Sequence, residues 1–381
     1  MKLIHLSDLH LGKRIGEASL LEDQAYILQQ ILNVISREEA DAVLIAGDVY
    51  DKTMPPVEAV MLFDDFLVNL SSTGIPVFII GGNHDSLQRL AFGARLMLPS
   101  GIHIAGGYEG SVKPIRMQDV YGAVDIYLLP FVKPAHVAGF CEDQTAETLH
   151  SYTEAVRLAV EKMKPDPAVR SVLVAHQFVT GAQRCESEEV VVGGLDNVDA
   201  SVFDAFDYVA LGHIHGPQSI GRPTIRYCGS PLKYSFSEAD HIKSVTVVEL
   251  GEKGNVAVRC VPLKPLRDLR RLRGTYQQLT MLSSYQNTSV EDYLQITLTD
   301  EQDIPDAIGM LRLIYPNLLR LEYDNARTRA ALQFSAPEMV KEQSQLELFG
   351  ELYEMQNNQP LEEEQVEFLR GLIEEIWEEQ L

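Results

Sequence analysis

The stretch Leu3-Ile4-His5-Leu6-Ser7-Asp8-Leu9-His10 joins an apolar run to a pair of polar side chains. A short run that is largely apolar, rather than alternating, is typical of a strand buried on both faces. Asp8 and His10 follow this run at its carboxyl end. Because ligands of open α/β sheets bind outside the carboxyl ends of the strands, we expect an α/β fold with polar groups gathered at that edge.

Four further motifs follow apolar runs in the same way. The runs are Ala42–Ala46, Val77–Ile80, Val172–Ala175 and Tyr208–Leu211. The motifs after them are Gly47-Asp48, Gly82-Asn83-His84-Asp85, His176 and Gly212-His213-Ile214-His215. A lone histidine or an Asp-x-His pair has little meaning, because most isolated histidines are core or loop residues. Five motifs that each end a predicted strand indicate one shared site.

The motifs supply enough oxygen and nitrogen ligands for two divalent metal ions. The seven candidate ligands are Asp8, His10, Asp48, Asn83, His176, His213 and His215. Carboxylates, imidazoles and one amide, without a thiolate, favour Mn²⁺ or Fe²⁺ over Zn²⁺. Asp48 is the natural bridging ligand, because the two oxygens of a carboxylate can hold two cations about 4 Å apart.

His84 and Asp85 are the candidate catalytic residues. A helix is predicted to begin after Asp85-Ser86, which leaves His84 on the preceding loop, where it faces the site without being a ligand. His84 would stabilise the developing charge and protonate the leaving oxygen. Asp85 would hold the imidazole in orientation. Asp85 could also be the N-cap of the helix, and the two roles are compatible.

Three regions are predicted along the chain. Residues 1–265 alternate strands with helices that lie outside the sheet, including a helix over Val57–Leu70 with Thr53 as its candidate cap. The pattern breaks between Leu263 and Gly274. Residues 266–335 then read as a small α+β capping domain, with expected elements at Tyr293–Leu298 (strand), Ile304–Ile314 (helix) and Leu318–Tyr323 (strand).

Residues 336–381 form an acidic tail, read as two helices separated by Gln356–Pro360. It holds 13 glutamates against two basic residues, and so carries 11 of the 23 net negative charges of the chain. An apolar stripe follows a helical period in the second helix, at Val366, Leu369, Ile373 and Ile376. The tail is interpreted as a docking element for a partner protein. The alternative is a solvated helix pair packed on its own domain.

Other features limit the setting of the protein. No run of 18 apolar residues occurs, and the start becomes polar too soon for a signal peptide, so we expect a cytoplasmic protein without a membrane partner. The four cysteines lie far apart and contain no Cys-x-x-Cys pair. They are therefore expected to be free thiols rather than metal ligands or disulfides.

The five motifs resemble those of the calcineurin-like metallophosphoesterases. A fuller match, over His5–Gly12, Ala46–Asp51, Gly82–Ser86, Asp207–His215 and Gly229–Glu238, resembles the SbcD family, the nuclease subunits of bacterial SbcCD complexes. The resemblance implies a β-sandwich flanked by helices, with a small α+β capping domain and a helical C-terminal tail. It also implies that one metal is held by Asp8, His10 and His215, and the other by Asn83, His176 and His213.

The same resemblance implies an Mn²⁺-dependent DNA nuclease. It would be a 3′→5′ exonuclease on double strands and an endonuclease on single strands and hairpins, acting in DNA recombination, replication and repair. The partner would be an SbcC-type coiled-coil ATPase, with the tail bound at the base of the coiled coil. Two nuclease subunits would pair through helices near Pro56–Leu70 and Ser86–Leu98, as a homodimer within a heterotetramer.

The net charge of −23 is unusual for a protein that handles DNA. Either the partner ATPase supplies most of the DNA affinity, which we favour, or local cations line an approach. The candidates are Lys13, Arg14, Arg89 and the basic run Arg267–Arg273, which could instead be a solvated linker. Two other functions remain open: a phosphodiesterase or phosphatase acting on small molecules or phosphoproteins, and a non-enzymatic DNA-end tether with a structural metal site.

Overall fold

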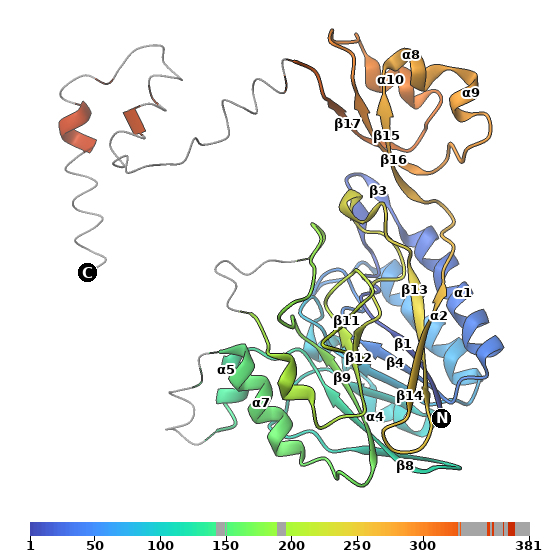
Figure 1. Ribbon diagram of the computed structural model, residues 1–381, viewed down its shortest axis with the longest axis vertical. Helices are drawn as coiled ribbons and strands as arrows, with labels where there is room; N and C mark the ends of the chain where they lie inside the picture. The colour runs from blue at the N-terminus through green and yellow to red at the C-terminus, as the bar shows by residue number, and fades with distance from the viewer. Residues whose placement is uncertain are drawn as a thin grey trace. The chain divides into compact units, whose positions relative to one another are not determined.

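The computed structural model describes residues 1–141, 149, 151–188, 196–326, 328, 349–350, 353, 361 and 365–369 (Figure 1). The chain divides into two units: Met1–Thr299 with Asp303–Glu322, and Asp300–Gln302 with Tyr323–Leu381. The first unit contains the sheets that carry the candidate site. Over the described residues, every helix is too short or too polar to span a lipid bilayer.

The first of two six-stranded sheets contains the start of the chain, with strand order β14-β13-β1-β4-β5-β6. Its strands are β1 (Lys2–Leu6), β4 (Ala42–Ala46), β5 (Val77–Ile80), β6 (Ile102–Ala105), β13 (Ser244–Leu250) and β14 (Val256–Pro262). Strands β1, β4, β5 and β6 are parallel, whereas β13 and β14 are added antiparallel at one edge. The carboxyl ends of β1, β4 and β5 therefore meet at one edge of the sheet.

The second sheet has the order β11-β12-β10-β9-β8-β7. Its strands are β7 (Ile115–Asp119), β8 (Gly122–Leu129), β9 (Arg170–His176), β10 (Tyr208–Gly212), β11 (Gln218–Ile220) and β12 (Arg222–Tyr227). Strands β8, β9, β10 and β12 are parallel. His176 pairs with Gly212 in the register of β9 and β10, so the last two motifs are neighbours.

The two sheets pack face to face, and helices cover both outer faces (Figure 1). The layer between the sheets is apolar, with Leu44, Phe78 and Val174 fully buried. The helices α1 (Leu21–Glu38) and α2 (Val57–Ser72) pack on the first sheet, and α5 (Pro134–Ala138) and α7 (Tyr152–Met163) pack on the second. The predicted β-sandwich flanked by helices is confirmed, as are all five predicted buried strands.

Short elements connect these layers. They are β2 (Arg14–Ile15), β3 (Ala18–Ser19), α3 (Leu87–Leu90), α4 (Ala94–Met97) and the 3₁₀ turns η1 (Leu98–Ser100), η2 (Ala200–Phe203) and η3 (Phe236–Glu238). The predicted cap at Thr53 is wrong. Helix α2 is preceded by Pro56 in an extended conformation, without a side-chain cap, because the fixed φ of proline itself sets the start of the helix.

The capping sheet is three-stranded, in the order β15-β16-β17. Its elements are β15 (Leu269–Gly274), α8 (Tyr276–Thr280), α9 (Leu282–Tyr285), β16 (Tyr293–Leu298), α10 (Ala307–Arg312) and β17 (Leu318–Tyr323). The two predicted strands are confirmed, and the predicted helix is shorter than expected. The reading of Leu263–Gly274 as a break is wrong over its second half, because β15 pairs in parallel with β16.

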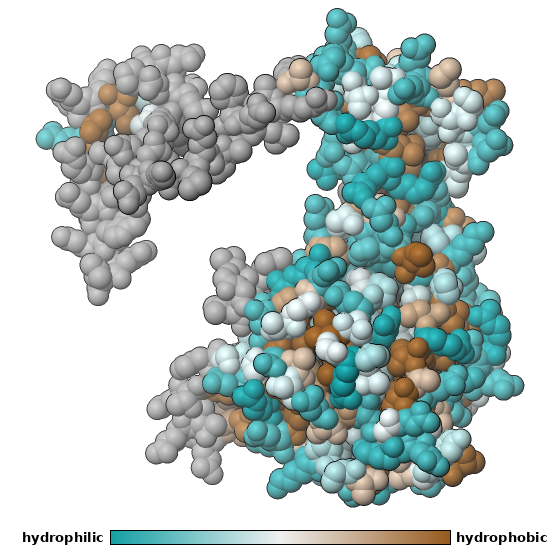
Figure 2. Space-filling view, viewed as in Figure 1, coloured by the Kyte–Doolittle hydropathy of each residue, from teal (hydrophilic) through white to brown (hydrophobic). Residues whose placement is uncertain are grey.

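The division at residues 265 and 335 stays a prediction. Residues of the capping sheet belong to the same compact unit as the sandwich. Most of the predicted tail helices, including Ile373 and Ile376, lie outside the described residues. The visible face of the molecule is mostly hydrophilic, as expected for so acidic a chain, with scattered hydrophobic areas (Figure 2).

Candidate metal centre

All seven predicted ligands and His84 gather at the edge where β1, β4, β5, β9 and β10 end. Six of the ligands are at most 7% exposed: Asp8, His10, Asp48, His176, His213 and His215. Asn83 and His84 are partly exposed. Buried charged and imidazole groups need partners, so the contacts of each group test whether a cation fits between them.

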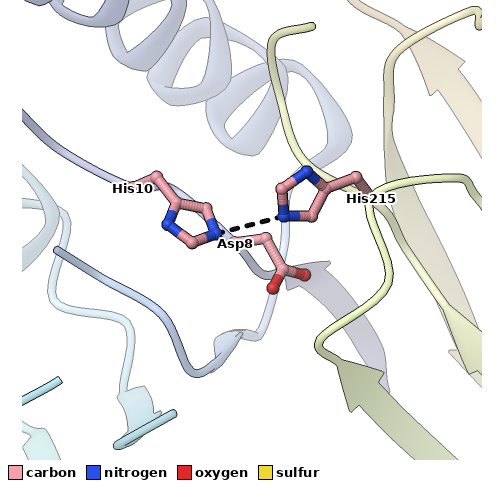
Figure 3. A group of neighbouring side chains, drawn as sticks. All are labelled: Asp8, His10 and His215. Carbon is pink, nitrogen blue, oxygen red and sulfur yellow. Dashed lines mark hydrogen bonds between the residues drawn. The ribbon is translucent and has the colours of Figure 1, made fainter. Parts of the chain in front are cut away.

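The first group of side chains consists of Asp8, His10 and His215. Figure 3 shows the two imidazoles facing each other, with the Asp8 carboxylate beside the gap. The Nε2 atoms of His10 and His215 are 3.1 Å apart. Candidate ligand atoms of all three residues lie within 4.8 Å of one another. This spacing suits ligands that converge on one ion.

The other nitrogen of each ring points away from the gap. His215 Nδ1 lies 2.8 Å from the Ser187 hydroxyl. His10 Nδ1 lies 3.6 Å from a carboxylate oxygen of Asp51. A proton on each Nδ1 leaves two Nε2 lone pairs directed at each other. Two acceptors 3.1 Å apart repel unless a cation lies between them, so this donor set fits a metal ion.

The second group consists of Asn83, His176 and His213. His176 donates its Nδ1 proton to the carbonyl oxygen of Ala46 at 2.7 Å, because a carbonyl can only accept. Its Nε2 atom then faces Asn83 Oδ1 at 3.0 Å. His213 Nδ1 lies 2.9 Å from the same amide oxygen. Two imidazoles that converge on one amide oxygen also fit a shared cation.

Asp48 lies between the two groups. One oxygen, Oδ2, is 3.6 Å from His10 Nε2 and 3.4 Å from His176 Nε2. The other oxygen, Oδ1, accepts the backbone N–H of His84 at 2.9 Å. A single carboxylate that faces an imidazole of each group has the position that a bridging ligand requires.

Unusual backbone conformations bring these side chains together. Four of the candidate ligands, Asp8, His10, Asp48 and His213, have positive φ angles between 42° and 104°. Non-glycine residues adopt such angles rarely, and strained residues of this kind concentrate at functional sites. The backbone also approaches closely at Gly212, where a Cβ atom would meet the carbonyl oxygen of Ala46 at 1.9 Å. The motif glycine is therefore required by space.

The pKa shifts of the site reflect crowded charges. Burial raises the pKa of Asp8 to about 6. Burial lowers the pKa of His176, but the Asp48 carboxylate outweighs it and raises the pKa to about 9. Without a metal, His176 thus takes up a proton as the positive charge that Asp48 requires. The site therefore has a local demand for cations, which divalent ions can meet.

His84 is positioned by the loop after β4. Its Nδ1 atom lies 3.0 Å from the carbonyl oxygen of Asp51, and its Nε2 atom is 4.0 Å from Asp48 Oδ2. The side chain is 15% exposed, more than the buried ligands, so a substrate can reach it. The predicted start of the following helix is confirmed, because α3 begins at Leu87 after Ser86.

Asp85 has a different place from the one predicted. Its carboxylate accepts the backbone N–H groups of Val49, Tyr50 and Gly82, at 3.0 to 3.1 Å. It is not the N-cap, which is Ser86. Asp85 therefore ties the Asp48 loop to the His84 loop through their backbones. The expected orienting role passes to the Asp51 carbonyl, which contacts the His84 ring.

Sequence reasoning missed the network behind His215. Ser187, Glu188, Glu238 and Lys243 lie there, and Glu238 is fully buried. Burial raises the pKa of Glu238, but its contacts with His215 and Lys243 outweigh burial and lower it. Glu238 ends a motif that was quoted for the resemblance, so that motif could have identified it. Ser187 and Glu188 follow no strand and lie in no motif.

The basic run Arg267–Arg273 is neither a linker nor a set of unpaired cations. Arg267 pairs with Asp23 at 2.8 Å, Arg270 pairs with Asp292 at 2.6 Å, and Arg271 pairs with Asp240. Of the other candidate cations, Lys13 pairs with Asp51 at 2.8 Å, next to the metal centre. These ion pairs reduce the charge that the chain itself can offer to a polyanion.

Comparison with known proteins agrees with this site. The family model described as calcineurin-like phosphoesterase matches residues 1–217. A second model, described as type 5 capsule protein repressor C-terminal domain, matches residues 265–357. A Staphylococcus epidermidis protein, named as the SbcD nuclease of an SbcCD complex, is 32% identical over 377 residues, which cover 98% of each chain.

Solved structures with a similar arrangement are more distant. A dimetal phosphatase from Danio rerio has a TM-score of 0.42 and 12% identity, covering 70% of this chain and 98% of that one. The protein TT1561 of Thermus thermophilus has a TM-score of 0.38 and 12% identity, covering 68% and 98%. Both TM-scores lie below 0.5, so neither likeness bears on the function of the chain.

Proposed function

Because the chain belongs to the calcineurin-like phosphoesterases and, within them, to the SbcD family of nucleases, we propose that it is an Mn²⁺-dependent DNA nuclease. It would act as a 3′→5′ exonuclease on duplex ends and as an endonuclease on single strands and hairpins. The observation that carries the chemistry is the pair of ligand clusters joined by Asp48.

We assign the seven predicted residues as the metal ligands. Asp8, His10 and His215 would hold one ion, Asn83, His176 and His213 the other, and Asp48 would bridge them. When bound, two divalent cations neutralise charge on the phosphate and make a water molecule acidic enough to attack it. The absence of a thiolate from this set supports Mn²⁺ over Zn²⁺.

His84 would act on the leaving oxygen. A carbonyl oxygen can only accept, so the Nδ1–H of His84 donates to Asp51 and fixes the ring. Nε2 is left to face the substrate and to give a proton to the oxygen that departs from phosphorus. Asp85 supports this geometry by holding the loops of Asp48 and His84 together.

The partner we propose is an SbcC-type coiled-coil ATPase, bound by the tail after residue 336. The ion-paired arginines of the capping sheet support this division of labour, because they leave most non-specific DNA affinity to the partner. We propose that such a complex acts on chromosomal DNA in the cytoplasm, in DNA recombination, replication and repair.

We further propose a homodimer of this chain within the complex. Helix α2 and the segment after α3 expose large apolar side chains: Val57 (70%), Met61 (62%), Phe92 (84%) and Leu96 (85%). One face of each segment packs on the sandwich, so the exposed residues are available to a partner. Exposed apolar patches of this kind mark interaction sites.

The test compares substrates on the full chain together with its ATPase partner. Duplex and hairpin DNA, cyclic nucleotides and phosphopeptides are each incubated with Mn²⁺ and with Mg²⁺. We expect Mn²⁺-dependent loss of nucleotides from 3′ ends and opening of hairpins. Efficient hydrolysis of cyclic nucleotides or phosphopeptides with intact DNA would contradict the proposal, and would favour a small-molecule or phosphoprotein substrate.

A further inference from the structure

The loop Arg184–Glu188 lies behind His215 and belongs to none of the five motifs. Ser187 Oγ is 2.8 Å from His215 Nδ1. The Glu188 carboxylate accepts the backbone N–H of His215 at 2.7 Å and that of Cys185 at 2.7 Å. One loop therefore contacts both the ring and the backbone of a candidate metal ligand.

The hydroxyl of Ser187 has a single proton, and that proton is already committed. Ser187 donates it to Glu238 Oε1 at 2.6 Å. Because the hydroxyl has no second proton, it can only accept from His215. The Nδ1 atom of His215 must therefore carry the hydrogen of this contact.

Glu238 is held as an acceptor from several sides. Lys243 donates its ammonium to Glu238 Oε2 and also contacts Ser230 Oγ and the carbonyl oxygen of His215, both at 2.8 Å. The backbone N–H of Tyr234 donates to Glu238 Oε1 at 3.1 Å. With its donors fixed, Glu238 determines the direction in which the Ser187 proton points.

We propose that Ser187 is a positioning residue for the metal centre, whose hydroxyl imposes the Nδ1–H tautomer on His215 and so directs the Nε2 lone pair at the ion shared with Asp8 and His10. The inference rests on the proposed metal centre. It adds a residue that acts through His215 and does not itself touch the ion. A partner of this kind changes metal affinity without being a ligand.

The chain offers a matched control. Ser235 Oγ also contacts Glu238 Oε1, at 3.4 Å, and lies beside Ser237. It is a serine on the same carboxylate, but its contacts are with Glu238 and Ser237 rather than with the His215 ring. Ser235→Ala therefore removes a hydroxyl from the network and leaves the link to His215 intact.

The test has two readouts on full-length wild type, Ser187→Ala and Ser235→Ala. Nitrogen-15 NMR of labelled histidines in the metal-free protein reports the tautomer of His215, whose signal is assigned from its loss in His215→Gln. Calorimetric titration with Mn²⁺ reports the number and affinity of ions bound. Circular dichroism confirms that each variant is folded.

We expect the Nδ1–H tautomer in wild type and in Ser235→Ala, and its loss in Ser187→Ala. Mn²⁺ affinity at one of two sites should fall about 10- to 100-fold in Ser187→Ala, while the other site keeps its affinity. An unchanged tautomer with two wild-type affinities would overturn the inference. A wild-type chain that binds fewer than two ions would contradict the proposed function instead, because the tautomer in the metal-free chain is read independently.

Discussion

The Nε2 atoms of His10 and His215 face each other at 3.1 Å, although the two residues are 205 positions apart in the sequence. Their outer nitrogens are turned toward Asp51 and Ser187, so both inner nitrogens present lone pairs. Such an arrangement is unfavourable without a positive charge between the rings. The fold holds it in place because the ends of β1 and β10 position each histidine loop.

Metal removal should therefore destabilise the folded chain. An ion that binds only the folded state stabilises it by about 2.7 kcal/mol at a concentration one hundred times its Kd. We expect the melting temperature measured by calorimetry to fall on chelation and to recover with Mn²⁺. His10→Ala should lose most of this recovery. Identical melting with and without Mn²⁺ in the wild type would argue against a metal centre.

His84→Ala should remove catalysis and keep the metals. A positioned proton donor contributes about 10²- to 10⁴-fold to a rate, so DNA cleavage should fall by that factor. Metal analysis should still find about two ions per chain, as in wild type. Parallel loss of metal and cleavage would make His84 a ligand and end its assignment as the acid.

Asp85→Ala should destabilise the protein before it affects chemistry. The carboxylate accepts three backbone N–H groups in a buried position, and its loss leaves them without acceptors. We expect a decrease of about 2 to 4 kcal/mol in the free energy of unfolding, measured with urea. Asp85→Asn keeps one acceptor oxygen and should lose less. Equal stability of both variants and wild type would show that the loops hold together without this carboxylate.

Val57→Glu with Met61→Glu should separate the proposed homodimer. Both side chains are more than 60% exposed on α2, so the substitutions leave the sandwich core intact. Sedimentation should show a dimer for wild type and a monomer for the double variant. Val120→Glu is the control, because Val120 is 93% exposed and lies between β7 and β8. A double variant that sediments like wild type places the subunit contact elsewhere.

Much of the site could be predicted because its ligands follow buried strands. Each strand read from an apolar run, such as Ala42–Ala46, is present, and its carboxyl end carries the predicted side chain. Parallel strands bring such ends to one edge, so strand order in sequence was enough to group the ligands. The chemistry of the site was therefore written in local patterns.

The parts that escaped prediction depend on tertiary contacts. Ser187 and Lys243 act on His215 from loops whose sequences carry no periodic signal. The strand Leu269–Gly274 looked like a linker because arginines dominate it, and their acidic partners, such as Asp292, lie elsewhere in the chain. Thr53 had the right chemistry for a cap, but Pro56 fixes the helix start three residues later.

The central claim is that one carboxylate joins two metal ions in this chain. Electron paramagnetic resonance of the Mn²⁺-loaded protein tests it directly, because two Mn²⁺ ions about 4 Å apart couple their spins through a bridging ligand. We predict two Mn²⁺ per chain with a spin-coupled spectrum, reduced to uncoupled Mn²⁺ in Asp48→Ala. A single, uncoupled Mn²⁺ in the wild-type chain at saturation would contradict the account.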